Sequence, residues 1–99
     1  MLKHIVLFKF KEETSQERIQ EARIKAQQLL YLDLIYEGDV YLNSPEANPS
    51  NYDLCLNFVF QSMDELNQYQ VHPEHMALKE SLMEYIDKRA CIDYELSAD

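Results

Sequence analysis

Two strand-like segments of this sequence, residues 2–10 and 52–60, carry apolar side chains on both of their faces. In the first, one face holds Val6, Phe8 and Phe10 and the other holds Ile5 and Leu7; in the second, one face holds Phe58 and Phe60 and the other holds Cys55 and Val59. Antiparallel strands usually alternate instead between apolar residues that face a core and polar residues that face water. A sheet built from these segments therefore needs an apolar cover on each of its faces.

The first half of the chain predicts a strand, a helix and a second strand. Residues 14–17 form the capping-box pattern, in which a hydroxyl stands three residues ahead of a glutamate, and this pattern places the helix cap at Thr14. The apolar stripe of this helix is Ile19, Ala22, Ala26, Leu29 and Leu30. We expect the second strand over residues 34–43 and a loop over residues 43–51, where turn-forming residues are dense.

The second half predicts a strand over residues 52–60, a helix in two pieces and a last strand. A capping box at residues 62–65 opens the first helical piece. The residue before a proline avoids helical angles, so we expect a break at His72 and a new start with Pro73 in the first helical position. The second piece should run through Ile86, and residues 89–96 should form the last strand.

The predicted order βαββαβ is that of an α+β ferredoxin-like domain, an antiparallel sheet with helices on one face. Those helices can cover only one of the two apolar sheet faces. A second copy of the chain, paired sheet to sheet by a symmetric contact, would cover the other face. We therefore expect residues 1–99 to form a single domain whose sheets pair as a homodimeric α/β barrel.

Composition excludes several classes of partner. The formal net charge is −9, from 18 acidic and 9 basic residues, so phosphate groups would be repelled and we expect neither nucleic acid nor a membrane surface as a partner. No apolar stretch is long enough to span a bilayer, and the first residues lack the pattern of a signal peptide. Cys55 and Cys91 are too few for a disulfide framework. These features favour a cytoplasmic protein.

Several segments resemble the stress-responsive dimeric α/β-barrel (Dabb) family, and they occur in that family's order. The segments are residues 3–10, 43–46, 52–53, 60–66, 69–75 and 92–95. The most recognisable is residues 69–75, a tyrosine followed by histidine, proline, any residue and histidine. The resemblance implies a dimeric barrel over nearly the whole chain. Two departures from the family pattern, at residues 31–36 and 54–55, weaken any inference of the substrate by analogy.

The histidines suggest a small-molecule pocket between the helices and the sheet. Helical periodicity places His75 on the inward face of its helix, and strand alternation places His4 on an apolar strand face. Tyr69 ends the first helical piece just before the break. We expect these polar groups to surround an apolar cavity that binds a hydrophobic or aromatic ligand. The expected ligand-contacting residues are His4, Val6, Phe8, His72, Leu78 and Leu82, with His72 also suited to cap the helix break.

The resemblance implies a second hypothesis, in which the pocket is catalytic. In the family's plant polyketide-cyclase branch the residues matching Tyr69 and His75 are the catalytic pair, and the one matching His4 lies in the same pocket. This implies cofactor-free ring closure, with His75 as the base and Tyr69 as the hydrogen-bond donor to the oxyanion. A dimeric-barrel monooxygenase is a further alternative, although this chain lacks tryptophan, which is familiar in that group.

One simpler interpretation remains open beside these hypotheses, and two kinds of bound group are not expected. The chain could be a purely structural dimer whose pocket is filled by its own side chains. Metal binding is not expected, because His72 and His75 stand on either side of a helix break and no set of carboxylates accompanies them. A phosphate-bearing cofactor is not expected either, because Gly38 is the single glycine and cannot form a glycine-rich loop.

Overall fold

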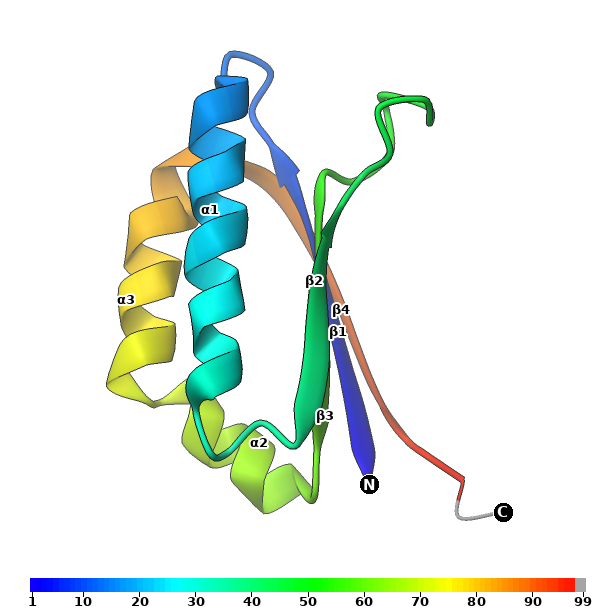
Figure 1. The fold of residues 1–99 in the computed structure, drawn as a ribbon, viewed down its shortest axis with the longest axis vertical. Coiled ribbons are helices and arrows are strands. Elements are labelled where there is room, and N and C mark those ends of the chain that lie inside the picture. The colour runs from blue at the N-terminus through cyan, green and yellow to red at the C-terminus, as the bar shows by residue number, and fades with distance from the viewer. Residues whose placement is uncertain (98–99) are drawn as a thin grey trace.

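The computed structural model describes residues 1–97 of the chain. Its elements are β1 (Leu2–Phe10), α1 (Gln16–Gln28), the 3-10 turn η1 (Leu29–Tyr31), β2 (Glu37–Leu42), β3 (Leu54–Phe60), α2 (Met63–Gln70), α3 (Pro73–Leu82), the 3-10 turn η2 (Met83–Tyr85) and β4 (Ile86–Glu95). The strands form one antiparallel sheet in the order β2-β3-β1-β4. The helices lie on one face of this sheet (Figure 1). The predicted α+β ferredoxin-like arrangement is confirmed.

The helix starts follow from local hydrogen bonds. Ser62 caps α2 as predicted, since its hydroxyl accepts from the Glu65 amide at 3.2 Å. The predicted cap of α1 is wrong by one residue: Ser15, not Thr14, accepts from the Arg18 amide at 3.2 Å. A cap side chain bonds the second or third helical amide, and in α1 Ser15 bonds the third, that of Arg18. None of the described helices is both long and apolar enough to cross a membrane.

The boundaries of three strands differ from those predicted. β2 begins at Glu37 rather than residue 34 and β3 at Leu54 rather than residue 52, because ladder pairing between them runs only from Glu37–Val59 to Leu42–Leu54. The second helical piece does not reach Ile86. It ends at Leu82, and Ile86 already belongs to β4, three residues before the predicted start of that strand.

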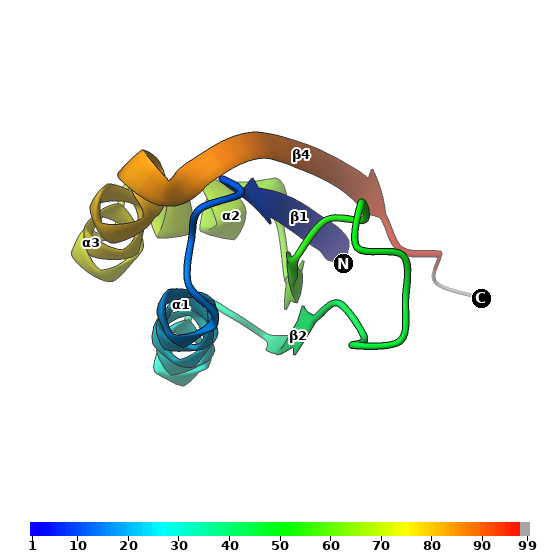
Figure 2. The ribbon, with the colours of Figure 1, turned by 90° about the horizontal axis from the view of Figure 1, so that it is seen from above.

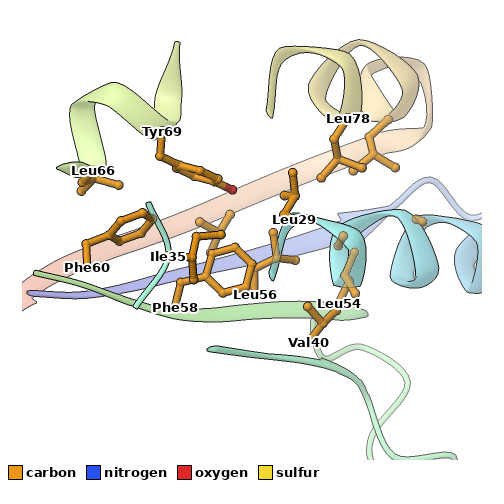
Figure 3. Packing of buried hydrophobic residues seen from close by; sticks show 14 of the residues in the cluster. Leu29, Ile35, Val40, Leu54, Leu56, Phe58, Phe60, Leu66, Tyr69 and Leu78 are labelled. Atoms are coloured by element: carbon orange, nitrogen blue, oxygen red, sulfur yellow. The ribbon is translucent and has the colours of Figure 1, made fainter. Parts of the chain in front are cut away.

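The core lies between the helices and one face of the sheet (Figure 3). Phe58 and Phe60 of β3 are fully buried there, so their strand face packs against the helices rather than against a partner. Gly38 pairs with Phe58 across the sheet. A Cβ atom at Gly38 would lie 2.6 Å from Cδ1 of Phe58, so the absence of a side chain lets the aromatic ring lie against β2.

The opposite face of the sheet has no helix over it in the described part of the chain (Figure 2). Ile5 of β1 pairs with Ile92 of β4, and Leu7 of β1 pairs with Cys55 of β3, which in turn pairs with Tyr41 of β2. Apolar side chains therefore run across all four strands on this face. In the single protomer Ile92 and Tyr41 are 58% and 57% exposed, so the second apolar face expected from the sequence is present and uncovered.

Candidate functional site

A cavity of about 520 Å³ opens between α3 and the sheet. Its lining residues are His4, Val6, Phe8, Leu56, Tyr69, Gln70, His75, Leu78, Lys79, Leu82, Met83, Ile86 and Arg89. The floor is formed by buried side chains, most of them apolar, whereas the mouth is formed by exposed ones, namely Gln70, Lys79, Met83 and Arg89. An apolar hollow of this size with a few polar groups is typical of a small-molecule site.

Most of the residues expected at the pocket do line this cavity, but His72 does not. His72 is the N-cap of α3, with extended backbone angles (φ −66°, ψ 139°), and Pro73 follows in the first turn of the helix. Its Nδ1 accepts from the Glu74 amide at 3.1 Å. The expected contact between His72 and a ligand stays a prediction, since His72 lies outside the lining of this cavity. The imidazole is held at the helix break by its capping role.

Tyr69, at the end of α2, is 1% exposed and lies among aromatic rings. Its ring centroid is 5.1 Å from that of Phe60 and 4.6 Å from that of His75. The hydroxyl points away from Phe60 into the space between α3 and the sheet (Figure 3), and among the described residues no hydrogen-bond partner holds it. Burial raises the pKa of Tyr69, with Arg89 opposing the shift, so the hydroxyl stays protonated and able to donate.

His75, in the first turn of α3, is half-buried at the cavity wall. Its Nδ1 lies 2.9 Å from the backbone oxygen of Gln70. A carbonyl oxygen can only accept, so Nδ1 carries the proton and Nε2 of the neutral ring keeps a free lone pair. Burial lowers the pKa of His75, and the nearby charge of Lys79 and other cations adds to this effect against the Gln70 hydrogen bond. The ring is therefore neutral at physiological pH and available as a base.

His4, on β1, is the buried polar residue of the cavity floor, at 2% exposure. Its Nδ1 is hydrogen-bonded to the Asp93 carboxylate of β4, directly across the strand pair. The ring centroids of His4 and Tyr69 are 6.3 Å apart. The carboxylate orients the imidazole through Nδ1, which leaves Nε2 as its second polar atom. Sequence reasoning placed Asp93 within a family segment but did not assign it to the site.

A possible metal-ligand set includes the same pair. His4 Nδ1, Cys91 Sγ and an Asp93 oxygen all lie within 4.8 Å of one another. Such a trio could supply three of the four ligands that zinc prefers, but the proton shared between His4 and Asp93 would first have to leave. Burial and the neighbouring Asp93 raise the pKa of the Cys91 thiol, which favours its protonated, non-ligating form. The absence of a metal site therefore stays a prediction.

Known proteins share this architecture. The model of the stress responsive A/B barrel domain (Dabb) matches residues 2–96. A stress-response A/B barrel domain-containing protein of Arabidopsis thaliana is 25% identical over 95 residues, which are 95% of this chain and 36% of that protein, so the chain spans about a third of its relative's length.

Two solved structures share the fold along almost their whole length. A dimeric protein of unknown function with a ferredoxin-like fold from Bacteroides fragilis is 29% identical, with a TM-score of 0.81 over 96% of this chain and 95% of that one. A hydroxynitrile lyase from Passiflora edulis has a TM-score of 0.82 over 99% of this chain and 94% of that one, at 16% identity. The second likeness is one of fold alone.

Proposed function

The chain belongs to the Dabb family of stress responsive A/B barrel domains, and on that premise we propose that it is a homodimeric protein that binds a small apolar or aromatic molecule. The observation that carries the proposal is the cavity of about 520 Å³. Its floor brings together Val6, Leu78 and Leu82 with three polar rings. A purely structural dimer with a filled pocket is disfavoured, because close-packed interiors leave few voids larger than a water molecule.

The binding proposal is tested with neutral aromatic probes such as indole and 2-naphthamide. Native mass spectrometry of the purified protein would first identify any molecule already bound. Leu78→Phe adds volume inside the cavity, whereas Met76→Phe adds it on the exposed side of the same helix. We expect probe binding to weaken in Leu78→Phe alone, provided that its thermal unfolding shows a folded protein. Equal binding by both variants, or no binding of any probe to the wild type, would contradict the proposal.

A second candidate function, proton transfer on a carbonyl compound, is favoured by one specific observation. The hydroxyl of the buried Tyr69 side chain has no hydrogen-bond partner among the described residues, and the ring lines the cavity beside the neutral ring of His75. His75 Nε2 would remove a proton next to the carbonyl group, and the Tyr69 hydroxyl would donate to the enolate oxygen that forms. This is the first step of an aldol- or Claisen-type ring closure. The monooxygenase alternative stays a prediction.

The enzyme candidate is tested by a reaction that needs only this first step. Ethyl benzoylacetate is a neutral aromatic β-keto ester whose acidic protons exchange with deuterium in heavy water, and NMR follows the exchange. We expect the protein to accelerate this exchange and His75→Ala to lose the acceleration while it still binds the probes. If the wild type exchanged deuterium no faster than buffer alone, the proposed catalysis would be wrong and the proposed ligand binding would stand.

The homodimer rests on the uncovered sheet face. Ile5, Leu7 and Ile92 lie side by side there, and similar structures such as the Bacteroides protein are described as dimeric. A second copy of the same face, brought in by a two-fold axis, would cover these side chains and remove apolar surface from water. The partner of this surface is therefore another copy of the chain. The mass of the protein in solution tests this.

A further inference from the structure

Two cationic side chains stand at the mouth of the cavity. Lys79 lies on α3 one turn after His75, and Arg89 lies on β4, where it pairs with Phe8 of β1. The mouth thus receives one cation from the helix and one from the edge strand of the sheet. Their charge reaches the polar groups inside, since both help to lower the pKa of His75.

Neither cation forms an ion pair among the described residues, and the Arg89 side chain is hydrogen-bonded to the Cys91 thiol. In the part of the chain that the structure describes, the ion pairs are His4 with Asp93, Lys9 with Asp53 and Arg18 with Glu21. Lys79 and Arg89 belong to none of them, and no residue that lines the cavity is acidic. The Asp93 carboxylate beside the cavity is already hydrogen-bonded to His4.

The positive mouth stands out against the charge of the whole chain. With 18 acidic and 9 basic residues, an average surface cation of this protein has two acidic residues available to pair with it. The cavity lining instead holds two cations outside any ion pair of the described residues, and no acidic residue. Between low-dielectric walls such a group of charges attracts anions more strongly than the same charges on an open surface.

We propose that the cavity takes an amphipathic carboxylic acid, with its carboxylate held between Lys79 and Arg89 and its apolar or aromatic body on the buried floor. Arg89 can donate two parallel hydrogen bonds to a carboxylate, and Lys79 supplies a point charge from the other wall. The body then lies against Val6, Leu78 and Leu82. The assignment rests on the proposed binding function and specifies its ligand.

The distribution of burial fits a ligand with one polar end. The exposed side chains that line the cavity are Gln70, Lys79, Met83 and Arg89, whereas the innermost groups are His4, Val6, Leu56 and Tyr69. A neutral hydrocarbon would leave both cations unpaired at its outer end. A carboxylate at that end would pair with them while staying near water, where the cost of removing its charge from solvent is small.

A matched pair of probes tests the charge. Isothermal titration calorimetry would compare 2-naphthoate with its neutral amide, 2-naphthamide, at neutral pH and low salt. We expect the acid to bind about tenfold tighter or more. Arg89→Gln and Lys79→Gln should each lower the affinity for the acid toward that for the amide and leave the amide unchanged. Lys25 is an exposed cation on α1, and Lys25→Gln is the control. It should change neither the affinity for the acid nor that for the amide.

The outcomes separate this inference from the binding function beneath it. Equal affinities of the wild type for acid and amide would overturn the charged-mouth assignment and leave a pocket for neutral ligands. The same conclusion would follow if both mouth variants kept the full affinity for the acid. Failure of every aromatic probe, charged or neutral, to bind would remove the binding function together with the assignment. Added salt should weaken the binding of the acid and leave the binding of the amide unchanged.

Discussion

His75 Nδ1 lies 2.9 Å from the backbone oxygen of Gln70, the last residue of α2. In an uninterrupted helix this oxygen would accept from the amide of Glu74, four residues on. That amide is bonded instead to Nδ1 of His72. The break before Pro73 thus frees the Gln70 oxygen for His75 and sets which ring nitrogen of His75 carries the proton. His72 therefore caps α3, and His75 is oriented by the Gln70 oxygen, which the Glu74 amide no longer occupies.

This relationship predicts that His72 acts on the site without touching it. In His72→Ala the Glu74 amide loses its acceptor, so we expect a loss of about 0.5–2 kcal/mol in the free energy of unfolding. The Gln70 oxygen would then be drawn toward that amide, and His75 would lose its fixed tautomer. Nitrogen-15 NMR of the imidazole reports this change. His72→Asn, which can cap, should keep both stability and tautomer; a His75 tautomer unchanged in His72→Ala would refute the link.

The titration of His75 gives a second prediction. Burial lowers its pKa below the ordinary 6.5 in the folded state. Between that lowered pKa and 6.5 the unfolded chain binds more protons at this residue than the folded chain does, so stability at this site rises with pH and is lost as pH falls. Urea unfolding across this window should show a smaller dependence on pH in His75→Gln. A proton NMR titration of His75 at or above 6.5 would count against the neutral base.

Tyr69→Phe removes a hydroxyl that has no protein partner within the described residues. We expect the free energy of unfolding to change by less than about 1 kcal/mol, because no hydrogen bond within the protein is lost. The rate of deuterium exchange into ethyl benzoylacetate should fall about 100- to 1,000-fold, because the enolate loses its donor. Tyr31→Phe, whose side chain is 89% exposed, is the matched control. An unchanged rate in Tyr69→Phe would take the hydroxyl out of the mechanism.

The dimer is tested at Ile92, on the edge strand of the uncovered sheet face. Light scattering of the wild type at micromolar concentration should give twice the chain mass of 11.8 kDa. Ile92→Asp should give the single chain mass with the fold intact, because Ile92 is 58% exposed in the protomer and a charge would be buried only in the dimer. Val71→Asp, at an exposed residue outside the sheet, should stay dimeric. A monomeric wild type would end the proposal.

Gly38→Ala tests the close approach of β2 and Phe58. The added methyl group would lie 2.6 Å from Cδ1 of Phe58 and 2.9 Å from Cδ2 of Leu30, so at least one side chain must move. We expect a loss of about 1–3 kcal/mol in the free energy of unfolding, as for other overpacked core sites. Chemical denaturation measures it, with Gln20→Ala on the exposed side of α1 as the control. A free energy of unfolding equal to that of the control would show that Phe58 or Leu30 moves without loss of stability.

The order of elements could be predicted from the sequence because it depends on local patterns. The run of β-forming residues in β1, the helical stripe that includes Ile19 and Ala26, and the proline after His72 are all local patterns. Each involves residues within a few positions of one another. The same patterns placed His4 and His75 on inward faces and Tyr69 at the end of a helix, and all three line the cavity. Ladder pairing decides where strands begin, and for this reason the predicted starts of β2, β3 and β4 were wrong.

What the sequence determined by itself is therefore the set of elements, the two apolar faces of the sheet and the polar groups that point inward. Only the tertiary structure decided which distant residues complete the site. Asp93 meets His4 across 89 residues of chain, and Arg89 reaches the mouth opposite Lys79. Both depend on the register of β1 against β4, and a slip of one residue would turn Asp93 and Arg89 to the other face. Register is set by packing of the whole sheet, which no local pattern contains.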